Sequence, residues 1–208
     1  MNVKWIFFDL GNTIYDETQS DKERIEKLLK IKEYGVTYEQ FWEEMKRASA
    51  NYAVSPFAAA RKKLGIEENV AYSGEKEVIF QDVAETLEIL HGKYRLGVIA
   101  NQPCTTFGRL EADGLKKYFD LCLLSEMEKI EKPAPEIFVR ALEMAKCRAD
   151  EAVMVGDRLD NDIFPAKKLG FHTIRICQGL GAWQKAPDER YCPDFEVGCF
   201  KELTDILT

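Results

Sequence analysis

Short apolar runs alternate along the chain with segments whose apolar positions recur every three or four residues. The first run covers residues 5–8 and ends at Asp9, and Gly11 with Asn12 then provides a turn signal. A continuous apolar run this short predicts a strand buried on both faces, as in a parallel sheet. Asp9 would lie at the carboxyl end of that strand, where open α/β sheets bind ligands. Alternatively, Asp9 caps the turn with its own side chain.

The alternation of strand-like and helix-like segments continues through the second half of the chain. Further strands are predicted at 96–100, 120–124, 152–155, 172–176 and 194–197. Helices are predicted at 78–90, 106–115, 135–145 and 162–169 and from 200 onward, with a long loop over 178–193. This β–α alternation predicts an α/β protein with a doubly wound parallel sheet.

Residues 15–78 show helical patterns only and interrupt that alternation. A first helix is predicted over 20–34, and Thr37 with Gln40 forms a capping-box pattern before a second amphipathic helix. Pro56 begins a third helix, which a glycine ends. Because the insertion follows the first strand directly, it would hang over the carboxyl end of that strand. We therefore predict a core domain of 1–14 and 79–208 and an all-helical cap domain of 15–78.

Composition narrows the class of protein. The chain has 208 residues, 46% of them hydrophobic, and a net charge of −7, which predicts a soluble globular protein that binds neither nucleic acid nor an anionic membrane. The six cysteines form no C-x-x-C pair, so reduced, mostly buried thiols in a cytoplasmic protein are expected. Neither histidine has a partner at zinc-site spacing. We also expect no signal peptide and no membrane span.

Candidate chemistry gathers at the predicted strand ends. Asp9, Asn101 and Asp157 each end a strand, and Lys132 begins a helix between two of them. Since parallel strands end at the same edge, two carboxylates would converge there and suit Mg²⁺. A lysine beside a metal suits a phosphoryl group. Each residue also has a simpler interpretation: Asp157 in a turn, Lys132 solvated at the surface, and Asn101 as a strand cap.

Taken together, these motifs resemble the haloacid dehalogenase (HAD) superfamily. They are the segments 9–13, Asn101, Lys132 with Pro133, and 156–162, and they occur in the order of the family's four motifs. The resemblance extends from about residue 5 to about residue 203 and includes a helical insertion between the first and second motifs, as in the family's first cap type. It implies a Rossmann-like core with that cap.

The resemblance also implies a metal site. Mg²⁺ would be held by the Asp9 carboxylate, the backbone carbonyl of Gly11 and the Asp157 carboxylate. Asp162 would orient these ligands from behind, with Asp160 as a further helper. Asp9 would also be the catalytic nucleophile and would form an aspartyl-phosphate.

The phosphate would be held by groups on the other motifs. Lys132 would bind both Asp9 and the phosphate through its charge. Backbone amides around Leu10, Gly11 and Asn101 would surround the phosphate oxygens.

Two positions depart from the pattern of this family's phosphatases. Gly11 stands where they usually carry a second aspartate, the general acid and base, whose loss typically costs about 10²–10⁴ in rate. Ala100 stands where they usually offer a hydroxyl to the phosphate, and a hydrogen bond to a charged group contributes about 1.5–3 kcal/mol. Asp16 is a possible substitute acid, although a turn or helix cap is the more ordinary role for it.

The sequence therefore predicts a Mg²⁺-dependent phosphohydrolase that acts on a small soluble phosphomonoester. The alternative is a catalytically impaired protein that binds phosphate or a metabolite as a regulatory module. A dinucleotide-binding oxidoreductase is disfavoured because no G-x-G-x-x-G follows a strand. A metal-free dehalogenase is disfavoured by the acidic fourth motif. Trp42, Tyr52 and Arg61 are candidates for substrate specificity, and the substrate and the oligomeric state are open.

Overall fold

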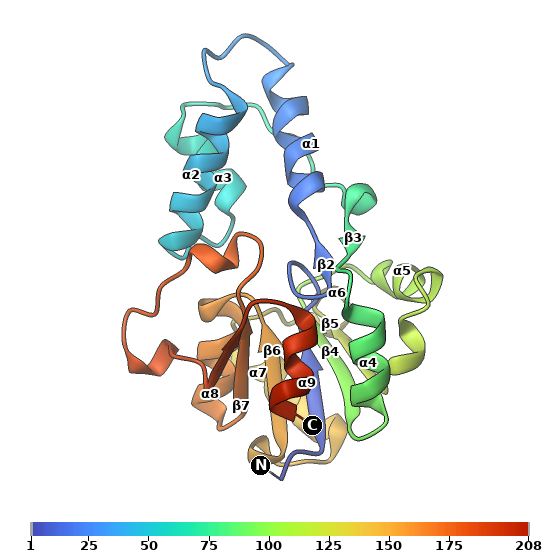
Figure 1. The fold of residues 1–208 in the computed structure, drawn as a ribbon. Helices are drawn as coiled ribbons and strands as arrows, with labels where there is room; N and C mark the ends of the chain where they lie inside the picture. The colour runs from blue at the N-terminus through green and yellow to red at the C-terminus, as the bar shows by residue number, and fades with distance from the viewer. Residues whose placement is uncertain (1, 208) are drawn as a thin grey trace.

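Six parallel strands form the central sheet of the computed structural model, which describes residues 2–207. Their spatial order is β5–β4–β1–β6–β7–β8, with β1 in the middle of the sheet (Figure 1). The strands are β1 (Trp5–Phe8), β4 (Arg95–Ala100), β5 (Leu121–Leu124), β6 (Ala152–Gly156), β7 (His172–Ile176) and β8 (Phe195–Val197). The predicted doubly wound parallel sheet is confirmed.

Helices cover both faces of this sheet. α4 (Val83–His91), α5 (Thr106–Ala112) and α9 (Leu203–Leu207) pack on one face, while α7 (Pro135–Ala145) and α8 (Phe164–Leu169) pack on the other. Along β1 the side chains alternate, because Ile6 and Phe8 join the first apolar cluster and Phe7 joins the second. The remaining short helices are α6 (Ser125–Glu128), η1 (Gly74–Lys76), η2 (Lys116–Tyr118), η3 (Ala149–Glu151), η4 (Leu159–Ile163), η5 (Gly181–Trp183), η6 (Glu189–Tyr191) and η7 (Phe200–Glu202).

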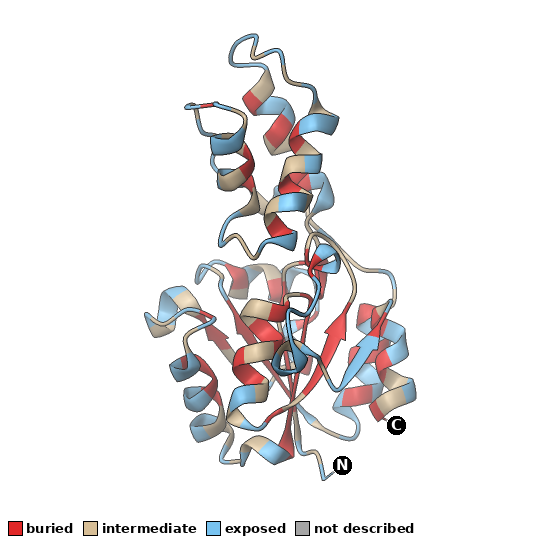
Figure 2. Cartoon of the chain, turned by 90° about the vertical axis from the view of Figure 1, so that its left-hand side faces the viewer, coloured by how far each residue is buried: buried red, intermediate tan, exposed pale blue. Residues whose placement is uncertain are grey.

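Three helices stand apart from the sheet, beyond the carboxyl ends of its strands (Figure 1). They are α1 (Thr18–Leu29), α2 (Tyr38–Ala50) and α3 (Pro56–Lys63), and we call residues 15–78, which contain them, the helical segment. It has an apolar cluster of its own, visible as separate buried residues in Figure 2. The chain leaves and re-enters the α/β part through an antiparallel pair, β2 (Tyr15–Asp16) with β3 (Val78–Ile79).

Local capping explains where these helices begin. Thr37 Oγ1 accepts a hydrogen bond from the Gln40 N–H, and the Gln40 side-chain oxygen accepts one from the Thr37 N–H, which is the predicted capping box. Ser55 caps α3 in front of Pro56. Several predicted helices are too long: the first ends at Leu29, and the one expected from residue 78 begins at Val83 because 78–79 pair with β2.

The cysteines differ from the prediction in their burial. All six are free, but Cys104 and Cys192 are exposed and the other four are half-buried, so the expectation of mostly buried thiols is wrong. Most of them lie in loops or just beyond the ends of strands and helices, where the backbone reaches the surface. Within residues 2–207, no helix has both the length and the apolar character needed to cross a membrane.

Candidate active site

Asp9 lies directly after β1, at the centre of the carboxyl edge. Its backbone N–H donates to the Val155 carbonyl at 2.9 Å, which ties it to β6. Because β1 lies between β4 and β6, the residues after these strands, Asn101 and Asp157, end on either side of Asp9. The sheet thus brings together the three strand-end residues that the sequence singled out.

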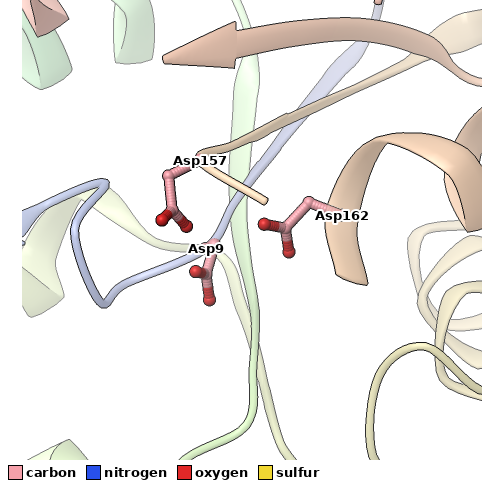
Figure 3. A group of neighbouring side chains, drawn as sticks. All are labelled: Asp9, Asp157 and Asp162. Atoms are coloured by element: carbon pink, nitrogen blue, oxygen red, sulfur yellow. The ribbon is translucent and has the colours of Figure 1, made fainter. Parts of the chain in front are cut away.

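Three carboxylates converge at this edge. Asp9, Asp157 and Asp162 each place an oxygen within 4.8 Å of the others, and Figure 3 shows the three side chains close together, with Asp162 on the helix that follows Asp157. Asp162 approaches the backbone so closely that a Cβ at Gly156 would overlap its side chain, so only glycine fits there. Asp162 also accepts a hydrogen bond from the Arg158 N–H at 3.0 Å.

Lys132 is buried between two of these carboxylates. Its side chain is 2% exposed, and its Nζ lies 2.8 Å from Asp9 Oδ1 and 2.6 Å from Asp162 Oδ1. Burial alone would lower the pKa of Lys132, but the negative charges of Asp162 and Asp9 raise it above its usual value. The ammonium is therefore charged at neutral pH, and Lys132 is not a solvated surface lysine.

The Asn101 side chain holds the backbone of Lys132. Its Nδ2 donates to the Lys132 carbonyl at 2.8 Å, and its Oδ1 accepts from the Lys132 N–H at 2.7 Å. These two bonds connect the end of β4 to the loop that carries the lysine. Asn101 thus positions Lys132 through its side chain, a contact that the sequence did not indicate.

Asp157 differs from its neighbours in lacking a hydrogen-bonded cation. Among residues 2–207, no donor bonds to its carboxylate, and burial followed by the charges of Asp162 and Asp9 raises its pKa well above the usual value. The pKa of Asp162 is raised to about 6, chiefly by burial. A largely buried, all-oxygen group in which one carboxylate has no hydrogen-bonded cation fits a hard divalent cation such as Mg²⁺.

Asp160 lies outside the acidic group. Its carboxylate receives hydrogen bonds from Arg158 at 2.6 Å and from the Gln184 side chain at 2.8 Å. Arg158 also donates to the carbonyls of Ala53 and Val54 in the helical segment. Asp160 is therefore placed to orient an arginine that connects the two parts of the chain.

The loop after β1 folds back tightly on itself. The Leu10 carbonyl accepts N–H groups from each of residues 13–15, and Asn12 has a positive φ of 53°. Within residues 2–207, the N–H groups of Leu10 and Gly11 have no acceptor in the protein. Adjacent free amides at such a turn can bind an anion.

Glu17 reaches this loop, although the sequence did not identify it as a site residue. Its Oε2 accepts a hydrogen bond from Asn12 Nδ2 at 2.9 Å, and its carboxyl carbon would lie 2.9 Å from a Cβ at Gly11. Burial, followed by the charges of Glu77 and other nearby acids, raises the pKa of Glu17 well above its usual value. No linear motif marks this acid, because its position depends on how the loop turns back.

Asp16, the acid that the sequence offered as a substitute, has an ordinary local role. Its carboxylate accepts the Thr18 N–H at 2.9 Å, at the beginning of α1. Its backbone belongs to β2 and pairs with Val78. The interpretation of Asp16 as a turn cap is the one that the structure supports.

Two cavities that share part of their lining lie beside the acidic group. A cavity of about 160 Å³ is lined by Asp9, Gly11, Glu17, Lys132 and Asp157 among others. A larger cavity of about 480 Å³ extends beneath the helical segment. Residues that line both, and so mark their junction, are Asn12, Glu17, Asn101, Gln102, Asp157 and Arg158.

None of the three predicted specificity residues lines either cavity. Tyr52 donates to the Lys185 carbonyl, Arg61 binds the carbonyls of 66–68, and Trp42 stacks on its neighbour Tyr38. The helical segment instead lines the larger cavity with Glu17, Asp21, Arg24, Met45, Ser49, Val54, Ser55, Pro56, Phe57 and Tyr72.

Known proteins share this architecture. A model of haloacid dehalogenase-like hydrolases matches residues 3–170. Glyceraldehyde 3-phosphate phosphatase of Pyrococcus furiosus is 28% identical over 99% of this chain and 93% of its own. Ribulose-1,5-bisphosphate 5-phosphatase of Halopiger xanaduensis is 34% identical over 78% of this chain and 70% of its own. The crystal structure of a HAD phosphatase from Thermococcus onnurineus has a TM-score of 0.66 and 25% identity, covering 99% of this chain and 98% of that one.

Proposed function

The chain belongs to the haloacid dehalogenase-like hydrolases, and we propose that it is a Mg²⁺-dependent phosphatase of small phosphorylated metabolites. The observation that carries this proposal is the buried Lys132 between Asp9 and Asp162, with Asp157 close to Asp9. A nucleophilic carboxylate, a fixed cation and an oxygen-only cation site suit phosphoryl transfer. The similar proteins named as phosphatases support the same reaction.

In this proposal Asp9 attacks the phosphorus and forms an aspartyl-phosphate, which water then hydrolyses. Lys132 keeps the Asp9 carboxylate in place and offsets the charge of the phosphate. The free N–H groups of Leu10 and Gly11 bind phosphate oxygens. Mg²⁺, held by Asp9, Asp157 and the Gly11 carbonyl, would neutralise the charge that the phosphate brings to these acids.

The helical segment is the proposed cap domain of 15–78, over a core of 1–14 and 79–208. Ser49 Oγ donates to the Leu180 carbonyl at 2.7 Å, and Arg158 donates to the Ala53 carbonyl. These bonds hold the segment over the larger cavity, so we assign substrate selection to its lining. The free cysteines agree with a cytoplasmic location.

An assay of phosphorylated metabolites with and without Mg²⁺ tests this function. We expect Mg²⁺-dependent release of phosphate, and no release by Asp9→Asn, which removes the nucleophile but keeps its shape. Binding of phosphate and Mg²⁺ without any turnover across the panel would instead support the regulatory-module alternative.

A further inference from the structure

We propose that Glu17 is the general acid and base of this site and supplies the carboxyl group that position 11 lacks. The inference rests on the phosphatase function proposed above. It assigns a catalytic role to a residue of the helical segment, six positions after the glycine.

The Glu17 carboxyl group lies beside Gly11. A side chain at position 11 would clash with this carboxyl group, since a Cβ there would lie 2.9 Å from the Glu17 carboxyl carbon. Gly11 is not among the residues with positive φ, so its backbone conformation does not itself require glycine. Glu17 therefore occupies the space into which an acidic side chain at position 11 would project.

Glu17 lies between the two cavities. The smaller cavity contains Asp9 and Lys132, and the larger one lies under the helical segment. If the phosphate binds at Asp9 and the leaving group binds in the larger cavity, the oxygen that joins them lies near the junction of the two cavities. Glu17 lines both cavities and therefore borders the junction at which the bond to that oxygen would break.

The Glu17 carboxyl group is held in place by its neighbours. Asn12 Nδ2 donates to Glu17 Oε2, and the Asn12 side chain is itself fixed against Gly179, where any Cβ would overlap it. Gly179 has a φ of 55°, a conformation that favours glycine. Asn12 is therefore a positioning residue for Glu17.

Other acids near the junction have different positions. Asp157 lies close to Asp9 in the proposed metal site, and Asp21 lines the larger cavity but not the smaller one. The carboxylate of Asp16 accepts the Thr18 N–H. Among the acids of the described chain, Glu17 is the one that lines both cavities without belonging to the acidic group.

Glu17 transfers one proton in each of the two proposed steps. An Asp9 oxygen forms a bond to phosphorus, the bond between phosphorus and the leaving oxygen breaks, and that oxygen takes its proton from the Glu17 carboxyl group. The resulting carboxylate then accepts a proton from water as the water oxygen bonds to phosphorus and the bond to Asp9 breaks. The products are the alcohol and inorganic phosphate, and Glu17 is protonated again.

Glu17→Gln tests the role, because it keeps the size and polarity of the side chain but cannot transfer a proton. Rapid-quench kinetics with Mg²⁺ would follow the first step on 4-nitrophenyl phosphate and on the best alkyl phosphate from a panel that includes glycerol 3-phosphate. We expect the first step on the alkyl phosphate to slow by about 10²–10⁴-fold. Release of nitrophenolate in the first turnover should change by less than about tenfold, since a stable anion needs little acid assistance.

Asp16→Asn is the matched control, since it changes the neighbouring acid and retains an oxygen for the Thr18 N–H. Both of its first-step rates should equal those of the natural chain. Glu17→Ala combined with Gly11→Asp should in turn recover at least tenfold in the alkyl reaction over Glu17→Ala alone, because the new carboxyl group enters the vacated space. Circular dichroism and Mg²⁺ affinity check that each variant is folded.

The outcomes separate the two proposals. If the natural chain turns over no phosphate ester, the phosphatase function fails and the role of Glu17 fails with it. If the natural chain cleaves nitrophenyl phosphate but no alkyl phosphate, the function stands and the acid role is overturned. An equal loss on both substrates in Glu17→Gln, no loss at all, or a folded double variant as slow as Glu17→Ala also overturns that role.

Discussion

The two sides of Asp9 hold their charged groups in different ways. On the sheet side, Asp9 and Asp162 share the buried ammonium of Lys132. On the side of the helical segment, burial raises the pKa of the Asp21 carboxyl to about 6, and the charge of Arg24 only partly opposes this. Burial raises the pKa of acids on both sides, to about 6 for Asp162 as for Asp21, so the difference between the sides is the buried ammonium of Lys132 on the sheet side, where the phosphate is expected.

Substitution of Lys132 should have the largest effect on the stability and activity of the sheet side of the site. Lys132→Ala leaves two adjacent carboxylates without their cation, so in the absence of Mg²⁺ we expect the free energy of unfolding to fall by about 3–5 kcal/mol. Turnover should fall by at least about 10²–10³-fold, as for the loss of one electrostatic donor. Urea unfolding and steady-state kinetics measure both effects. Lys62→Ala, at an exposed position of α3, is the control and should change neither.

Replacement of the Asp157 carboxylate should weaken Mg²⁺ binding but stabilise the metal-free protein. Asp157→Asn should weaken Mg²⁺ binding by at least about 10²-fold in calorimetry, since even residues behind a metal's ligands contribute about 10–100-fold. Without Mg²⁺ the same variant should be more stable, because it removes a buried charge that is repelled by Asp162 and Asp9. Asp160→Asn, outside the acidic group, is the control. Unchanged Mg²⁺ affinity in Asp157→Asn would exclude the proposed site.

The same contrast separates what the sequence could predict from what it could not. The family resemblance and the parallel sheet are confirmed, and the sheet explains why Asp9 and Asp157 meet: parallel strands end at one edge. The proposed roles of these residues stay predictions. No sequence pattern marks Glu17 as a site residue, because its approach to Gly11 depends on a loop that folds back on the Leu10 carbonyl.

The residues that line the larger cavity could not be predicted from the sequence either. An amphipathic pattern shows which helix face is buried, but it does not show which neighbour covers that face. The sequence offers Trp42 and Tyr52 as candidates without showing which way they face, and both contact other parts of the protein rather than the cavity. Arg24, which does line the cavity, had no distinguishing feature within the charged first helix.

Asp21 allows a test of protonation on the side of the helical segment. Its pKa rises from 3.8 to about 6 on folding, so the folded chain binds the proton more tightly and its contribution to stability falls as pH rises between these values. Asp21→Asn should remove this pH dependence of the free energy of unfolding. Above pH 6 it should raise that free energy by up to about 3 kcal/mol, because a difference of one in pKa corresponds to about 1.36 kcal/mol. Urea unfolding from pH 4 to 7 measures it. If the stability of the variant depends on pH as that of the natural chain does, Asp21 is not the source of this pH dependence.

The smallest expected effect concerns the contact between the two regions themselves. Ser49 Oγ donates to the Leu180 carbonyl across the boundary, and loss of one such hydrogen bond typically costs about 0.5–1.5 kcal/mol. In Ser49→Ala, amide exchange in α2 should therefore speed up by at most about tenfold, while exchange in α7 on the sheet stays unchanged and serves as the internal reference.

Beryllofluoride with Mg²⁺ should act in the opposite direction. As a phosphate mimic at Asp9, it should slow exchange throughout residues 15–78 if this segment closes over an occupied site. Because Ser49→Ala removes a hydrogen bond between the helical segment and Leu180, the protection should be smaller in the variant but still present. Exchange in residues 15–78 that ignores the mimic in both forms would contradict the cap role, and the larger cavity would then be a fixed feature of the fold.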